Sequence, residues 1–127
     1  MANPSKKKGT RYESAVVKFM TAAGLDVARK ALSGSQDSGD LEVRGLKIPI
    51  IIEVKGGKQT ANPNRFQLTD WFRQTAVEAD NAKATLGMLV VVRYNRKVKD
   101  ADVYFKHHGA IAHMWLDELC ETLKSYK

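Results

Sequence analysis

The sequence predicts an α/β fold in which a mixed β-sheet is flanked by helices. Hydrophobic spacing along the chain switches between the period of amphipathic helices and that of strands. The segments follow the order helix, three strands, helix, three strands, helix, which is typical of a sheet with helices packed on it. The length of 127 residues suits one domain. We place that domain at residues 10–127, behind a flexible basic arm at residues 1–9.

The first helix is expected to begin at Thr10 and to stop at Gly24. Apolar side chains recur at helical spacing from Tyr12 to Ala23. Thr10 is the expected N-cap, with Glu13 three residues on as its capping-box partner. Glu13 lies next to the apolar arc of this helix, so its side chain is expected at the rim of the core.

A loose strand over residues 25–32 precedes the central hairpin of the predicted sheet. The first strand of the hairpin opens at Asp40, and the chain turns near residues 44–46. It returns through "IPIIIEVKGG" at residues 48–57. Because Pro49 cannot donate to a hydrogen-bond ladder, it indicates an edge or a bulge in this returning strand.

The second half of the chain repeats the pattern. Residues 84–94 form a continuous apolar run that is typical of a strand covered on both faces. Trp71 and Trp115 are assigned to the core, and Gln74 and Glu78 to the solvent-facing side of a helix. The expected bounds are 64–81 for that helix, 84–94, 101–105 and 110–115 for the strands, and 116–126 for the last helix.

The composition points to a polyanionic partner. There are 21 lysines and arginines against 14 acidic residues, a net charge of +7. Such an excess favours nucleic acid over simple solubility, because basic side chains release the counterions of phosphates. No apolar run reaches the roughly 18–20 residues that span a bilayer, and the N-terminus lacks the apolar stretch of a signal peptide. We therefore expect a cytoplasmic protein without a membrane partner; its single cysteine excludes an internal disulfide.

Three ionisable residues of the hairpin suggest chemistry. Alternation puts Glu53 and Lys55 on one face of the returning strand, together with Ile51. Asp40 lies opposite residues 50–53 across the hairpin. Two neighbouring carboxylates both stay ionised only if a cation joins them, and oxygen ligands suit Mg²⁺. A lysine beside that cation can hold or deprotonate a water. These are the parts that phosphodiester hydrolysis needs.

Each of these residues also has a purely structural explanation. Glu53 and Lys55 could form an ordinary salt bridge at an exposed strand end. Glu13 could serve only in the capping box, and Asp40 could be a turn residue after glycine. The acidic residues that could replace Asp40 as a ligand are Asp37 and Glu42.

Three segments in this order resemble the PD-(D/E)XK nuclease superfamily: "KGTRYES", "SGSQDSGDLEV" and "IIEVKGG". They are most similar to the archaeal-type Holliday-junction resolvases, a cytosolic and phage-encoded branch. The resemblance covers roughly residues 7–60 and continues more weakly through the next helix and strand. Gly39 stands where the superfamily has its proline, which implies a looser turn before Asp40.

The resemblance implies a restriction-endonuclease-like fold and a structure-selective DNA endonuclease. Such an enzyme depends on Mg²⁺ or Mn²⁺, cuts four-way junctions as a homodimer, and leaves 5′-phosphate and 3′-hydroxyl ends. Asp40 and Glu53 would ligate the metal together with the Val54 carbonyl. Lys55 would position or activate water, and Glu13 would complete the acidic site through a water.

The resemblance and the charge pattern also imply DNA contacts. Ser33 and Ser35 lie on a serine loop that contributes near the scissile phosphate in such resolvases, and Gln67 aligns with a glutamine. A second basic group, at residues 93–99, is available for tracking phosphates. The candidate DNA-binding residues near the acidic site are Lys6, Lys7, Lys8, Arg11, Arg29, Lys30, Lys58, Arg65 and Gln67.

Three other functions remain open at this point. The first is a related nuclease that acts on flaps, nicks or duplex DNA. The second is a nucleic-acid-binding protein that uses the same scaffold without catalysis. The third is a small structural domain, for which the acidic residues would be a coincidence.

Overall fold

The computed structural model describes residues 4–30, 39–107 and 110–127, and it confirms the predicted α/β fold. The helices and strands follow the predicted order along the chain. Their bounds are α1 Pro4–Ala22, β1 Asp26–Arg29, β2 Leu41–Arg44, β3 Ile50–Lys55, α2 Arg65–Asn81, β4 Leu86–Val91, β5 Asp102–His107, β6 Ala110–Trp115 and α3 Leu116–Lys124, with short 3₁₀ turns at η1 Lys58–Thr60 and η2 Val98–Asp100.

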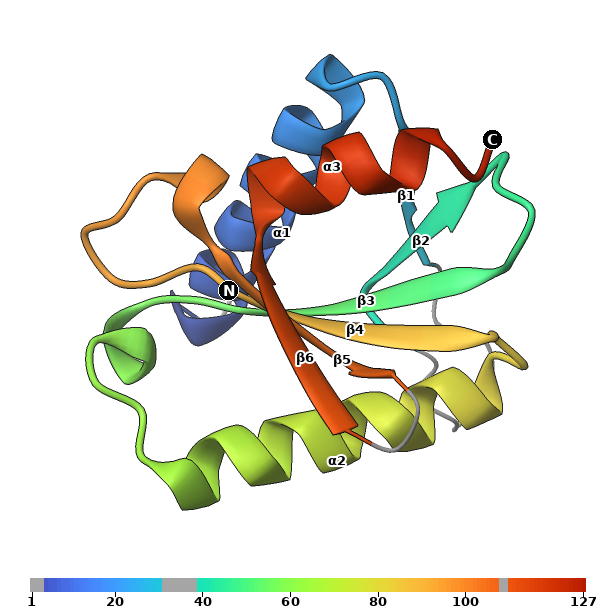
Figure 1. Cartoon of the computed structure of the whole chain (residues 1–127). Helices are drawn as coiled ribbons and strands as arrows, with labels where there is room; N and C mark the ends of the chain where they lie inside the picture. The colour runs from blue at the N-terminus through green and yellow to red at the C-terminus, as the bar shows by residue number, and fades with distance from the viewer. Residues whose placement is uncertain (1–3, 31–38, 108–109) are drawn as a thin grey trace.

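The molecule has three layers. A six-stranded sheet in the order β1-β2-β3-β4-β5-β6 has α1 and α3 on one face and α2 on the other (Figure 1). β3 and β4 are parallel, whereas the other neighbouring strands are antiparallel. Because β3 and β4 run in the same direction, their carboxyl ends reach the same edge of the sheet. Ligands of open α/β sheets commonly bind outside such ends.

Alternation along the strands fills both faces of the sheet. Ile50, Ile52 and Val54 of β3 pack with α1 and α3 in the larger core cluster. Leu89 and Val91 of β4 face the other way, against Trp71 of α2. β4 is therefore covered on both faces, as its apolar run predicts. Within the described ranges, no helix is long and apolar enough to cross a membrane.

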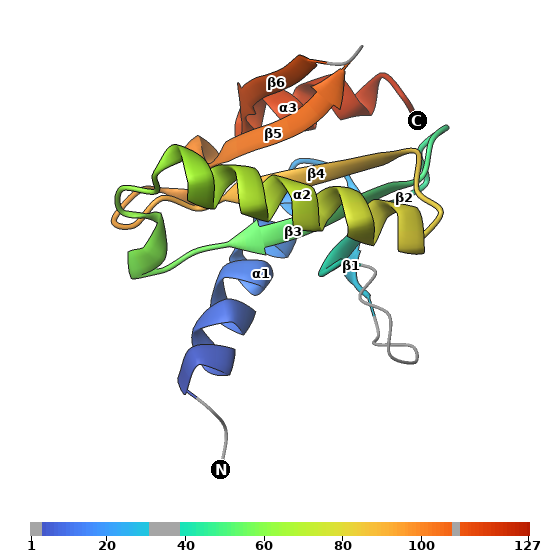
Figure 2. The same ribbon diagram turned by 90° about the horizontal axis from the view of Figure 1, so that it is seen from below.

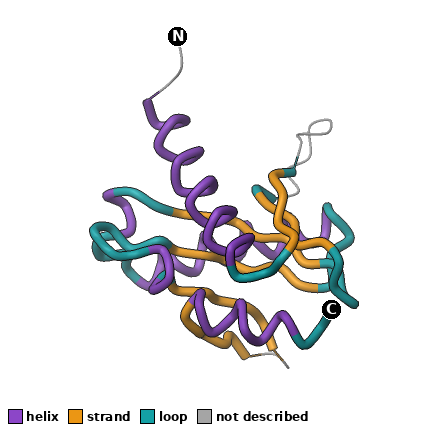
Figure 3. The backbone as a smooth tube through the Cα atoms, turned by 90° about the horizontal axis from the view of Figure 1, so that it is seen from above, coloured by secondary structure: helices purple, strands orange, loops and turns teal. Residues whose placement is uncertain are grey.

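Helix α1 begins earlier than the sequence analysis predicts. It starts at Pro4, so residues 4–9 are helical, and the expectation of a flexible arm does not hold for them. Thr10 lies inside the helix, so its assignment as an N-cap is wrong. The capping-box explanation for Glu13 depends on that N-cap and is therefore wrong as well. The first turns of α1 project away from the sheet (Figures 2 and 3).

Three further expectations are corrected. Pro49 lies just before β3, which is an interior strand, so it does not mark an edge; its carbonyl accepts hydrogen bonds from two successive amides, those of Thr85 and Leu86, as at a bulge. Trp115 is 46% exposed, because β6 is the edge strand. Glu78 is buried rather than solvated, since it lies seven residues from Trp71 on the buried side of α2.

A close contact fixes α1 against the end of β3. A Cβ at Gly56 would lie 2.3 Å from Cγ of the Tyr12 ring, far inside normal contact. The ring therefore sits directly on the backbone that leaves β3. The role of Gly56 is to admit α1 at this point, and Glu13 is the next residue along that helix.

Candidate active site

The hairpin of β2 and β3 holds the Asp40 carboxylate against β3. Leu41 pairs with Ile52, and the Asp40 amide donates to the Ile52 carbonyl at 3.1 Å. Just before the start of β2, Asp40 Oδ2 accepts a hydrogen bond from the Val54 amide at 2.9 Å. This bond fixes the carboxylate at the backbone of β3, one residue from Glu53.

Glu53 and Lys55 form a partly buried ion pair. Glu53 is only 5% exposed, and its Oε1 lies 3.5 Å from the Lys55 ammonium. The same ammonium donates to Gln74 Oε1 at 3.5 Å, and Gln74 Nε2 donates to Glu78 Oε1 at 3.0 Å. A polar chain therefore runs from β3 into α2. Burying a carboxylate requires such a partner, because an isolated charge in a core costs several kcal/mol.

Glu13 brings a third carboxyl group to this place from α1. Burial, and then the charge of Asp40 and a hydrogen bond to it, raise the pKa of Glu13 from 4.5 to about 7. The charge of Glu53 acts in the same direction, while that of Arg29 opposes it. The Arg29 guanidinium, from β1, donates to the Ser14 hydroxyl on α1. Elements α1, β1, β2 and β3 thus converge on one acidic site.

Gly39 explains the departure from the proline of the superfamily motif. Its φ of +98° lies in the left-handed region, which the ring of proline cannot adopt. A Cβ at this position would lie 3.1 Å from Cδ1 of Ile51. Ile51 therefore packs beneath the turn that leads into Asp40, and the turn is closely packed rather than loose.

Gln74 and Glu78 of α2 are the residues of this site that the sequence analysis missed. Their signal was present: Glu78 has the helical spacing i+3 and i+7 from the buried Thr75 and Trp71. Gln67, the glutamine that the sequence analysis singled out, lies in the first turn of α2. Its backbone amide donates to Asn64 Oδ1, the N-cap of this helix, at 2.8 Å.

The other predicted site residues are distributed as follows. Ser33, Ser35 and Asp37 lie outside the described residues. The backbone amide of Lys30 donates to the Asp40 carbonyl, and Lys30 and Glu42 both line a separate cavity of about 340 Å³. The remaining basic candidates lie on helices and turns: Lys6, Lys7, Lys8 and Arg11 in α1, exposed Lys58 in η1, and exposed Arg65 at the start of α2.

The donor set fits a hard divalent cation. In the described part of the chain, no three acidic, histidine or cysteine side chains are already arranged to hold a metal ion. The contacts of the acids account for this: Lys55 faces Glu53, and Glu13 shares a hydrogen bond with Asp40. The ligands available are all oxygens, three carboxylates and the Val54 carbonyl, which suits Mg²⁺ or Mn²⁺.

Comparisons with known proteins agree with this geometry. The solved structure of Hjc from Archaeoglobus fulgidus, a Holliday junction resolvase from an archaeal hyperthermophile, has the same fold. It matches with a TM-score of 0.54 and 16% identity, over 87% of this chain and 93% of that one. No curated protein matches the chain in sequence. The model of the phage putative PDDEXK endonucleases matches residues 4–121. The chain therefore belongs to this phage endonuclease family and is a nuclease of the PD-(D/E)XK type.

Proposed function

We propose that the protein is an Mg²⁺- or Mn²⁺-dependent DNA endonuclease that cuts four-way junctions as a homodimer and leaves 5′-phosphate and 3′-hydroxyl ends. The observation that carries this proposal is the convergence of Glu13, Asp40 and Glu53 with Lys55 at the carboxyl end of β3. PD-(D/E)XK nucleases generally depend on divalent metal. The fold shared with a Holliday junction resolvase supports the choice of substrate.

The metal would be held by Asp40, Glu53 and the Val54 carbonyl, with Glu13 completing the site through a water. When bound, the cation neutralises the negative charge that develops on the phosphate during hydrolysis. Glu13 and Asp40 share a hydrogen bond, so one of these two carboxyl groups holds a proton, and a bound cation would favour the ionised form of both.

Lys55 has the position of the residue that holds and activates water. Its Nζ atom lies between Glu53 Oε1 and Gln74 Oε1, at 3.5 Å from each. These two acceptors hold the side chain in place, so a water at this end of β3 can accept a hydrogen bond from a fixed ammonium. Gln74 is thus a positioning residue, since it acts through Lys55.

DNA contacts are assigned to the basic residues around the acidic site. The net charge of +7 supports phosphate binding in general. The projecting turns of α1 carry Lys6, Lys7 and Lys8 away from the sheet (Figure 3). Ser33 and Ser35 are proposed to act near the scissile phosphate. The other proposed contacts are Arg11, Arg29, Lys30, Lys58, Arg65 and Gln67.

The homodimer is supported by an apolar surface on α2 and β6. Phe66 is 73% exposed and Ile111 is 60% exposed. Ile111 lines a cavity of about 330 Å³ together with Leu68, Phe72 and Tyr104 among others. A surface of this kind marks an interaction site more often than a solvated face. We place the protein in the cytoplasm, where it would meet branched DNA, and treat residues 10–127, together with the first turns of α1, as one nuclease domain.

The test is cleavage of end-labelled DNA of defined shape. The purified protein is incubated with a four-way junction, a flap, a nicked duplex, an intact duplex and a single strand, each with Mg²⁺ or with EDTA. The proposal expects paired symmetric cuts in the junction that require Mg²⁺ and that ligase can reseal. Equal cutting of flap or duplex would replace the junction by a broader substrate class. Binding without products in Mg²⁺ and in Mn²⁺ would overturn the nuclease.

A further inference from the structure

A second polar cavity lies beside the acidic site, on the same face and at the same end of the sheet. Its volume is about 570 Å³. Lys55 pairs with Val91, Val91 with Asp102, and Asp102 with Trp115, so these four residues form one row across the strands. At about 4.8 Å per strand, Asp102 is ~10 Å and Trp115 ~14 Å from Lys55.

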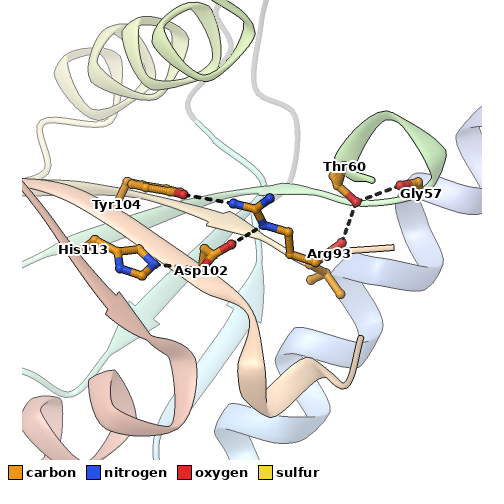
Figure 4. A network of polar contacts seen from close by, with 7 residues as sticks. Gly57, Thr60, Arg93, Asp102, Tyr104 and His113 are labelled. Carbon is orange, nitrogen blue, oxygen red and sulfur yellow. Dashed lines mark hydrogen bonds and ion pairs between the residues drawn. The ribbon is translucent and has the colours of Figure 1, made fainter. Parts of the chain in front are cut away.

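The loop that follows Lys55 forms one wall of this cavity. Ala61 lines it, directly after η1. The buried Thr60 hydroxyl lies 2.7 Å from the Gly57 carbonyl and 2.9 Å from the Val92 carbonyl, which ties the loop to the end of β4 (Figure 4). The loop that leaves the acidic site at Lys55 therefore also borders the cavity.

Arg93 is held at the cavity by two partners. Its Nε donates to Asp102, which is 4% exposed, and its Nη2 donates to the Tyr104 hydroxyl at 3.5 Å (Figure 4). The other Asp102 oxygen lies 2.8 Å from His113 Nε2. A guanidinium that is already ordered loses little entropy when it binds a ligand, so the site is preorganised.

Two aromatic side chains are exposed at this cavity. Trp115 is 46% exposed, and its ring meets His113 edge-on with centroids 4.9 Å apart. Tyr94, in the turn that follows β4, is 39% exposed and also lines the cavity. An exposed indole that is fixed by a second ring offers a flat surface for stacking, which is the feature that proteins use to hold unpaired bases.

The charges of the cavity exclude a site for phosphate alone. Arg93 and Arg96 line it, but so do Asp117 and Glu118 at the start of α3. Further carboxylates, Asp100 and Asp102, are paired with basic side chains. A phosphate would be repelled by the acids, whereas an uncharged ring with both donors and acceptors can meet both signs. Guanine fits best, because arginine pairs with its O6 and N7 acceptors and a carboxylate accepts from its amino group.

We propose that this cavity binds one unstacked base, preferentially guanine, of the DNA strand that the acidic site cuts. The inference rests on the proposed nuclease function, since it uses that strand as ligand. A distance of ~10–14 Å corresponds to about three or four nucleotides along a strand. Branched and single-stranded DNA supply bases that are free to leave the stack at little cost.

The experiment is an abasic scan that reads binding rather than cutting. A fluorescein-labelled four-way junction carries one abasic nucleotide at each of the first six positions from the branch in turn. Affinity is measured by anisotropy in EDTA, for the wild type, Trp115→Ala and Arg96→Ala. Trp115→Phe keeps a stacking ring, and Tyr126→Ala, which removes a similarly exposed aromatic residue from the C-terminus, is the matched control.

The wild type, Trp115→Phe and Tyr126→Ala are expected to lose about ten-fold in affinity at one position only, the loss of one stacked base. In Trp115→Ala the affinity should no longer depend on the position of the abasic nucleotide. At the sensitive position, a junction with guanine should bind better than one with thymine to the wild type but not to Arg96→Ala. A flat profile in the wild type, or an unchanged one in Trp115→Ala, overturns the cavity but leaves the nuclease untouched. A loss of affinity at one position only, in a wild-type protein that cuts no DNA, supports base binding in the cavity and overturns the proposed nuclease activity.

Discussion

Two buried carboxylates on the same face of the sheet are held in opposite ways. Asp102 has a donor for each oxygen, from Arg93 and from His113. Glu53 faces one ammonium at 3.5 Å and shares its surroundings with two more acids, Asp40 and Glu13. The first group is balanced in charge, whereas the second has more carboxyl groups than nearby cations. An excess of carboxyl groups over cations destabilises the folded state, but it supplies the negative oxygen ligands that a divalent cation binds. The excess of negative charge therefore distinguishes a functional site from a group that only stabilises the fold.

Asp40→Asn should show the difference between the acidic site and the group around Asp102 most strongly, because it should lower cleavage without unfolding the protein. An asparagine oxygen can still accept from the Val54 amide, so the fold is kept. The charged ligand is lost, and metal-assisted hydrolysis is worth several kcal/mol, so cleavage should fall by about three orders of magnitude. DNA affinity should be equal or higher, because one repulsive charge is gone. Single-turnover cleavage and anisotropy on the same junction measure both quantities.

Glu42→Gln is the matched control for this variant. Glu42 lies two residues after Asp40, in β2, but it is one of the residues that line the separate cavity together with Lys30. It should therefore cut at the wild-type rate. If Glu42→Gln abolishes cleavage while Asp40→Asn does not, the assignment of the metal ligand in β2 is wrong.

Asp102→Asn should have the opposite effect: it should lower the free energy of unfolding and leave cleavage nearly unchanged. Removing one partner of a buried ion pair costs about 3–5 kcal/mol, and since the Arg93 side chain is 33% exposed we expect about 2–3 kcal/mol here. Cleavage by the folded protein should change less than about ten-fold, because Asp102 lies ~10 Å from Lys55. Urea unfolding and single-turnover cleavage measure the two effects.

The control for Asp102 is a pair of the same residue types at the surface. Asp26 and Arg44 lie 3.4 Å apart and are both more than half exposed. Exposed pairs contribute about 0–1 kcal/mol, so Asp26→Asn should leave the free energy of unfolding almost unchanged. If Asp102→Asn and Asp26→Asn lost equal free energy of unfolding, the buried pair of Asp102 would not stabilise the fold more than the exposed pair of Asp26.

The sequence predicts the elements and most of the acidic site because these depend on local patterns. Alternation alone places Glu53 beside Lys55, and the hairpin brings Asp40 to them. The balanced group was not predictable in the same way. Arg93, Asp102 and His113 come from three strand regions whose register is set by tertiary pairing. Trp115 was assigned to the core because a pattern of apolar residues does not reveal that β6 is an edge strand.

Glu13 gives the smallest effect, and its sign can be worked out. Burial, followed by Asp40, raises the pKa of this carboxyl to about 7 in the folded protein, whereas an unfolded chain has a value near 4.5. Between these values the folded state binds a proton that the unfolded state has lost. The free energy of unfolding therefore falls as pH rises from 4.5 to about 7, and then levels off.

Glu13→Gln cannot lose a proton, so it should flatten this dependence. The contribution is on the order of 1 kcal/mol after screening by solvent, because the side chain is partly exposed. Urea unfolding in EDTA at several pH values between about 5 and 8 measures the slope, and the exposed Glu121→Gln serves as the control. Since a charged Glu13 beside Asp40 is the state that a metal would stabilise, adding Mg²⁺ at the upper end should restore stability to the wild type more than to Glu13→Gln. Equal slopes in the two proteins would mean that Glu13 is not part of the acidic cluster, and the imbalance would then rest on Asp40 and Glu53 alone.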